Sequence, residues 1–78
     1  MSSRLPPVSS RDVIRVLQRY GFRLIKGRGK GSHVFMYRDD PPTGITIPER
    51  RELASGTLRN ILRQAGISQQ EFLELLKG

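Results

Sequence analysis

Apolar residues recur along this chain with two spacings, one typical of helices and one typical of strands. Ser9 and Asp12 have the spacing of a capping box, and the apolar residues after them share one helical face until Gly21. A second helical pattern lies between Ser55, a candidate N-cap, and Gly66, a candidate left-handed stop. Two amphipathic helices are therefore predicted, with apolar faces made of Val13, Ile14, Leu17 and Tyr20, and of Leu58, Ile61, Leu62 and Ala65.

A third, shorter helix is predicted near the C-terminus. Ser68 and Glu71 form another capping box. The residues that follow are too apolar to remain in water, namely Phe72, Leu73, Leu75 and Leu76. This helix must therefore pack on the domain or on a partner.

Between the two long helices the pattern changes to the alternation of strands. Residues 22–26 are expected to form a first strand that turns Phe22 and Leu24 toward the core. Residues 39–44 contain two prolines and read as a turn, and residues 45–47 as a third strand. The order predicts an α+β domain, α-β-β-β-α with a short extra C-terminal helix. Its long helices cover one face of a three-stranded antiparallel sheet, and the other face is free.

The second strand, residues 33–38, contains the only histidine of the chain. An alternating strand puts His33, Phe35 and Tyr37 on one face and the residues between them on the other. The two aromatic rings could stack on bases or complete the core. His33 is either an acid or base beside a partner, or an ordinary surface or packing residue.

The remaining segments are polar. Residues 1–7 are expected to form a disordered leader, and residues 8–78 a single domain. Residues 49–54 are expected to form a loop anchored by Leu53, with charges that belong to ordinary surface.

The charge of the chain is strongly positive and unevenly distributed. Fourteen Lys and Arg residues against seven acids give a net charge of +7. Residues 1–38 carry nine basic residues and one acid, net +8, whereas residues 39–78 carry five basic and six acidic residues, net −1. The first half therefore favours a polyanionic partner such as nucleic acid.

Basic residues gather in the glycine-rich connection that leads into His33. Residues 27–31 alternate glycine with Arg28 and Lys30, so the backbone can approach a partner closely where the charge is concentrated. Ser32 could bond a phosphate or stabilise the turn. The candidate RNA-binding residues are Lys26, Arg28, Lys30, Ser32, Arg38, Arg59 and Arg63. A further stripe of Arg11, Arg15 and Arg19 could contact phosphates or form a solvated face.

Several other chemistries are excluded by the residues themselves. The chain has no cysteine and one histidine, so it has neither a disulfide framework nor the ligands of a zinc site. It has no phosphate-binding GxxxxGK[ST] motif. Asp39 and Asp40 stand in a turn, where acids are common for local reasons. We expect no metal and no cofactor, and, without a signal peptide or membrane span, a cytoplasmic protein.

Five segments occur in an order that resembles one known family. They are V-S-S-R-D-V-I-R-V-L from Val8, Y-G-F-R-L from Tyr20, K-G-S-H from Lys30, I-T-I-P from Ile45 and G-T-L-R-N-I-L-R-Q-A-G-I-S from Gly56. Together they cover about residues 8–76 and resemble the HicA family, small mRNA interferases of bacterial and archaeal toxin-antitoxin systems. The resemblance implies a double-stranded-RNA-binding-like fold, mRNA as substrate, a HicB-like antitoxin as partner, and a catalytic role for His33.

Two features differ from the usual HicA pattern. Many relatives carry a histidine and a glycine after the proline that ends the third strand, whereas this chain has Glu49-Arg50-Arg51 in a shortened segment. The glycine loop before His33 is also longer and more basic. The K-G-S-H motif itself is intact.

The resemblance predicts a mechanism with a single catalytic histidine. His33 would remove a proton from the RNA 2′-hydroxyl as it attacks the adjacent phosphorus, and Arg28, Lys30 and Arg38 would offset the charge on the phosphoryl oxygens. An antitoxin would cover His33 and the basic face. Two other functions use the same features: an RNA-binding module without catalysis, and a protein-interaction domain for an acidic partner.

Overall fold

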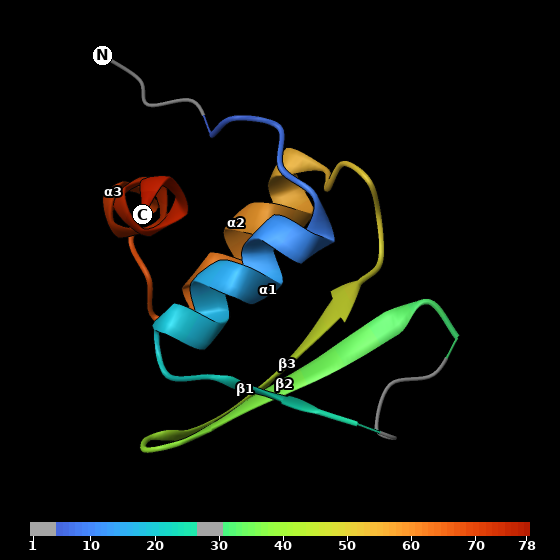
Figure 1. The fold of residues 1–78 in the computed structure, drawn as a ribbon, viewed down its shortest axis with the longest axis vertical. Coiled ribbons are helices and arrows are strands. Elements are labelled where there is room, and N and C mark those ends of the chain that lie inside the picture. Colours follow the sequence, from blue (N-terminus) through green and yellow to red (C-terminus); the bar gives the residue numbers. More distant parts are fainter. Residues whose placement is uncertain (1–4, 27–30) are drawn as a thin grey trace.

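The elements of the chain follow the predicted order in the computed structural model, which describes residues 5–26 and 31–78 (Figure 1). A helix is followed by three antiparallel strands and two more helices, which is consistent with a double-stranded-RNA-binding-like α-β-β-β-α fold with an added helix. The elements are α1 (Ser10–Arg19), β1 (Arg23–Ile25), β2 (His33–Asp39), β3 (Pro42–Pro48), α2 (Ser55–Ala65) and α3 (Gln69–Lys77).

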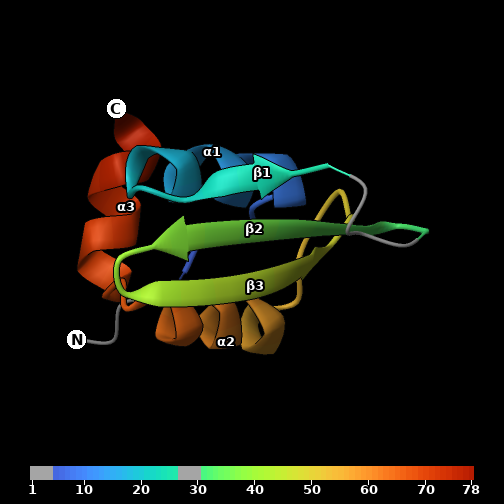
Figure 2. The same ribbon diagram turned by 90° about the horizontal axis from the view of Figure 1, so that it is seen from below.

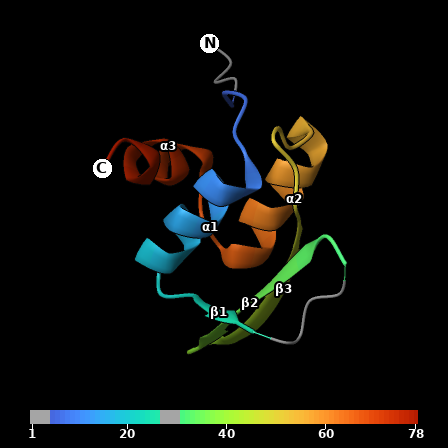
Figure 3. The same ribbon diagram turned by 45° about the vertical axis from the view of Figure 1, so that its right-hand side comes forward.

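The sheet is a meander with the strand order β1-β2-β3. Both long helices cover one of its faces, α1 over β1 and α2 over β3, as Figures 1 and 2 show. Figure 3 shows the helices as one layer above the sheet. In the part of the chain that the structure describes, no element covers the other face, and this face is where His33 was expected.

The first helix begins and ends where the sequence predicted. Ser9 Oγ accepts a hydrogen bond from the Asp12 N–H, and Asp12 Oδ2 accepts one from the Ser9 N–H, both at 3.1 Å. This reciprocal capping box satisfies two of the amide groups that a helix start leaves without partners. Gly21 follows the helix with φ = 103°, a left-handed conformation that glycine adopts without strain.

The start of the second long helix corrects one prediction. Ala54, not Ser55, is the N-cap residue, and no side chain caps this helix. Leu53, which is buried, donates its N–H to Val8 O at 2.8 Å. This bond fixes the chain just before the helix, so Ser55 is already its first residue. Gly66, with φ = 77°, ends the helix as predicted.

The strands are longer than the sequence predicted around their shared turn. β2 extends to Asp39 and β3 begins at Pro42, opposite it, so the turn contains only Asp40 and Pro41. Pro42 stands at the first position of an edge strand, where a missing N–H is tolerated.

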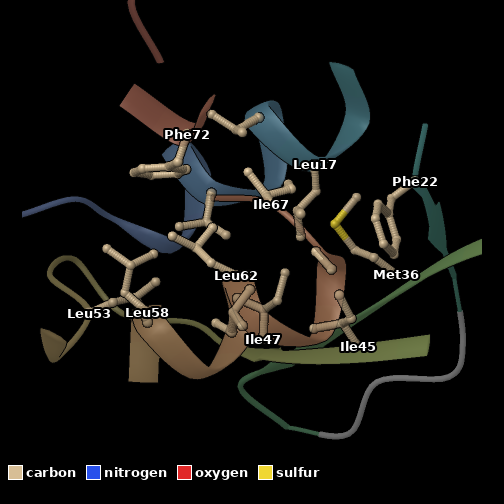
Figure 4. Close-up of a cluster of buried hydrophobic side chains, with 14 of the residues drawn as sticks. Leu17, Phe22, Met36, Ile45, Ile47, Leu53, Leu58, Leu62, Ile67 and Phe72 are labelled. Carbon is tan, nitrogen blue, oxygen red and sulfur yellow. The ribbon is translucent and has the colours of Figure 1, made fainter. Parts of the chain in front are cut away.

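The hydrophobic core lies between the sheet and the helices. Met36, Ile45 and Ile47 project from the sheet and meet α1 and α2 through side chains such as Leu17 and Leu62 (Figure 4). Val16, which lies outside the predicted apolar stripe, is also completely buried.

One predicted core residue is exposed. Leu24 pairs with Met36 and so belongs to the helix side of the sheet, yet 40% of its surface is accessible. Its strand β1 is an edge strand of three residues, so Leu24 has a neighbouring strand on one side only.

The last helix packs on the domain itself. α3 contacts α1 and α2, and Phe72 is completely buried. Its capping box is formed by Ser68 and Glu71 as predicted. Leu5, within the segment expected to be a leader, also packs against the core. None of the helices described is long and apolar enough to cross a membrane.

Candidate nucleic-acid interface

His33 is the first residue of β2 and is exposed at the end of the sheet. It lies opposite Pro48, the last residue of β3. Just before it, the Ser32 carbonyl accepts a hydrogen bond of 2.6 Å from the Glu49 N–H. The start of β2 is therefore attached to the end of β3, and this attachment positions an accessible imidazole.

The aromatic residues of β2 lie on the uncovered face and are not in the core. Phe35 and Tyr37 are both half-buried, and neither belongs to the buried cluster. Of the two roles considered for these rings, completion of the core is excluded, because Phe22 and Phe72 are the buried aromatic residues of the core. The half-buried rings leave part of their surface toward solvent.

An ion pair lies next to Tyr37 on the same face. Arg23 Nη1 and Nη2 donate to Asp39 Oδ2 and Oδ1, and the guanidinium carbon is 5.6 Å from the centre of the Tyr37 ring. The hydrogen bond from Arg23 holds the pKa of the Asp39 carboxyl below its usual value. Asp39 thus serves as the counter-ion of Arg23. Within residues 5–26 and 31–78, no group of three or more His, Asp or Glu side chains could hold a metal ion.

The structure does not bring Arg38 together with His33. Arg38 lies on the helix side of β2, with its guanidinium carbon 4.6 Å from the centre of the Phe22 ring. It donates to Ala65 O and Thr43 Oγ1, each at 3.2 Å. Ala65 is the last residue of α2, so a cation satisfies a carbonyl at the negative end of that helix. Arg38 fixes the fold on the face opposite His33.

The other predicted RNA-binding residues fall into separate groups. Lys26 and Ser32 are exposed at the same end of the sheet as His33. Arg28 and Lys30 lie outside the described residues.

Arg59 and Arg63 are exposed on α2. They line a shallow hollow with Ile67, Ser68 and Gln69, where α2 gives way to α3. In Figures 1 and 2, α3 and the start of β2 lie on opposite sides of the domain. The end of the hollow next to α3 is therefore remote from the start of β2.

A second shallow hollow contains Arg50 and Arg51, which the sequence interpretation had assigned to ordinary surface. Arg11 of α1 meets Arg50 and Arg51 of the loop after β3, together with Ser9, Ser10, Ile14 and Glu49. The loop is held there because Ser10 Oγ donates to Arg50 O and accepts from the Arg50 N–H, both at 3.1 Å. These segments are 40 residues apart. The local sequence therefore carries no sign that they meet.

The sequence of the chain matches one known protein family over most of its length. Residues 10–67 match the sequence model described as HicA toxin of bacterial toxin-antitoxin. The chain belongs to the HicA toxin family. HicA toxins are mRNA interferases that pair with HicB antitoxins. The match begins at the first residue of α1, includes Lys30–Gly31–Ser32–His33 and ends before α3. No curated protein matches the chain significantly.

Proposed function

We propose that this chain is a metal-independent endoribonuclease that cleaves mRNA in the cytoplasm, with His33 as its one catalytic residue. The observation that supports it most directly is the position of His33. This histidine is exposed at the end of β2, beside the uncovered face, and lies inside the segment shared with HicA toxins. An exposed imidazole at the rim of an uncovered face is accessible to a long, flexible substrate.

The proposed reaction begins at the ribose. Imidazole changes its charge near neutral pH, so His33 can take the proton of the 2′-hydroxyl as the oxygen attacks the adjacent phosphorus. The bond from phosphorus to the 5′ oxygen then breaks, which leaves a 2′,3′-cyclic phosphate. The 5′ oxygen takes up a proton, for which the imidazolium formed in the first step is a donor.

Positive charge near His33 would lower the barrier by offsetting the charge on the phosphoryl oxygens. We assign this role to Lys26, Arg28 and Lys30, with Ser32 as a hydrogen-bond donor to a phosphate. Arg38 is left out, since its guanidinium is bonded on the other face of the sheet. Arg59 and Arg63 would contact RNA far from the cleaved bond, or the antitoxin.

A HicB-like antitoxin would inhibit the enzyme by covering His33 and the uncovered face. The half-buried rings of Phe35 and Tyr37 offer apolar contact beside the histidine. Acidic residues of the partner would complement the basic residues around it. A stable interface needs about 1,200 Å² of buried surface or more, so such a partner would cover much of the face.

Cleavage of a purified mRNA in the presence and absence of excess chelator tests the proposed chemistry. Cleavage at the same rate in both samples, with 2′,3′-cyclic phosphate ends, is expected. If the chain binds RNA without cutting it, the alternative of a non-catalytic RNA-binding module is correct. If cleavage requires a divalent ion, the mechanism through His33 alone is wrong.

A further inference from the structure

The hollow formed by Arg11, Arg50 and Arg51 has the character of an anion site. All three side chains are exposed, and they come from two segments that the fold brings together, the first turn of α1 and the loop after β3. Glu49 is the one carboxylate among the residues that line the hollow, against three guanidinium groups. The local field is therefore positive.

Hydrogen bonds hold the backbone of the loop that carries Arg50 and Arg51 against the start of α1. The Ser10 N–H donates to Arg50 O at 3.0 Å, in addition to the two bonds of the Ser10 hydroxyl with the Arg50 backbone. Leu53, three residues after Arg50, is buried in the core. Because the backbone beneath the guanidinium groups is already ordered, a ligand that binds them needs to order only their side chains.

The charges of this hollow are not neutralised by the described residues. Arg50 Nη1 donates to the Glu49 carbonyl at 2.8 Å, and no ion pair involves Arg11 or Arg51 within residues 5–26 and 31–78. By contrast, Arg15 on the same helix pairs with Asp12 at 3.6 Å. Of the three arginines on α1, Arg11, Arg15 and Arg19, only Arg11 lines the hollow.

The hollow adjoins the proposed catalytic end of the sheet. Glu49, which lines it, donates its N–H to Ser32 O, and Pro48 lies opposite His33. An RNA strand whose cleaved bond lies at His33 would continue past this hollow.

The lining of the hollow favours a phosphate backbone over a protein partner. A stable protein interface needs a desolvated apolar centre, but Ile14 is the only apolar side chain among the residues that line the hollow. Guanidinium groups bind phosphate oxygens in bidentate geometry. The N-terminus of α1 adds little, because the N–H groups of Ser9, Ser10 and Asp12 already donate hydrogen bonds within the protein.

We propose that Arg11, Arg50 and Arg51 bind the backbone phosphates of RNA that flank the bond cleaved at His33. The inference rests on the proposed function, because it assumes an RNA substrate at His33. It adds a binding surface built from the first turn of α1 and the loop after β3.

The test measures binding separately from cleavage. All proteins carry His33→Ala, so that a labelled single-stranded RNA stays intact, and affinity is measured by fluorescence anisotropy at several salt concentrations. The variant Arg11→Ala/Arg51→Ala is compared with Arg15→Ala/Lys77→Ala, which removes the same charge from exposed positions outside the hollow. Arg50 is kept because its backbone holds the loop.

The hollow variant should lose about 1.4 from the slope of log affinity against log salt, or about 0.7 for each of two phosphate contacts, while the control keeps the parent slope. Arg11→Lys/Arg51→Lys should recover most of the slope, which shows that charge and not a folding defect is responsible. Equal slopes for the hollow and control variants would overturn the subsite and leave the proposed function standing. Failure of the His33→Ala parent to bind RNA at all would overturn both.

Discussion

The ring of Phe35 lies against the backbone of Gly44 across β2 and β3. A β-carbon at position 44 would stand only 2.7 Å from Cζ of Phe35. Glycine on this edge strand thus makes room for an aromatic ring that lies on the sheet face opposite the helices. The surface beside His33 depends on this contact.

Gly44→Ala should destabilise the domain by about 1–3 kcal/mol, because the added methyl group forces the Phe35 ring to move. Thermal or denaturant unfolding measures the effect. The matched control is Gly56→Ala in the first turn of α2, where nothing lies within 4 Å of the new carbon. It should be neutral or stabilise by up to about 1 kcal/mol. In a Phe35→Leu background most of the cost of Gly44→Ala should disappear, and a cost that persists there would contradict the contact.

Arg38 should matter for stability and not for RNA binding. Arg38→Met removes its bonds to Ala65 O and Thr43 Oγ1 and its contact with the Phe22 ring, with an expected cost of about 1–3 kcal/mol. The slope of log RNA affinity against log salt should be the same for Arg38→Met as for the unsubstituted chain. As a control for stability, Arg59→Ala at an exposed position of α2 should change unfolding by less than about 0.5 kcal/mol. A reduced salt slope for Arg38→Met would return this arginine to the RNA surface.

The ion pair between Arg23 and Asp39 should give the fold a small dependence on acid. The pKa of Asp39 is lower in the folded state than in the unfolded chain, so its stabilisation is complete above its unfolded pKa and disappears as the pH falls through the folded value. The melting temperatures of the parent and of Asp39→Asn should therefore differ at neutral pH and converge in acid. Since both side chains are exposed, salt should reduce this difference.

Asp40→Asn is the control for this measurement, because it removes the same charge one residue away from the ion pair. It should not reproduce the pH-dependent difference. If the difference in melting temperature between the parent and Asp39→Asn stays constant as the pH falls, the ion pair contributes nothing through its charge.

The order of the elements could be predicted because each signal was local. Capping boxes at Ser9 and Ser68 and the left-handed glycines at positions 21 and 66 fixed four helix boundaries from residues close in sequence. The prediction of Ser55 as the N-cap was wrong because α2 begins one residue earlier than the local sequence favours. The start of the helix follows Leu53, whose N–H is bonded to Val8 O outside the helix.

The site depended on relationships that no local pattern records. Arg38 sits in a basic run, but alternation along β2 turns it to the helix side, where α2 supplies a carbonyl. Arg50 is exposed, as the sequence indicated, but its backbone contact with Ser10 could not be predicted because it joins positions 40 residues apart. The distribution of charge in the sequence favoured a polyanionic partner, but it did not show that Arg38 bonds to the helix layer.

Antitoxin and RNA should compete for the chain if a HicB-like protein covers His33. Addition of a cognate antitoxin to a complex of His33→Ala with labelled RNA should release the RNA, at a concentration set by the affinity of the antitoxin. His33→Ala is used so that cleavage does not mimic release. A stable ternary complex with undiminished RNA affinity would contradict the occlusion proposed here.

The central claim is that His33 is the base of an RNA-cleaving site. The most direct measurement is the single-turnover rate of mRNA cleavage by His33→Ala, compared with Thr46→Ala, an exposed substitution on the neighbouring strand β3. Both variants should unfold within about 0.5 kcal/mol of the parent. Cleavage by His33→Ala should be slower by about 10²–10⁴-fold, the usual contribution of a general base, and cleavage by Thr46→Ala should be unchanged. A folded His33→Ala protein that cleaves RNA at the parent rate would contradict the mechanism.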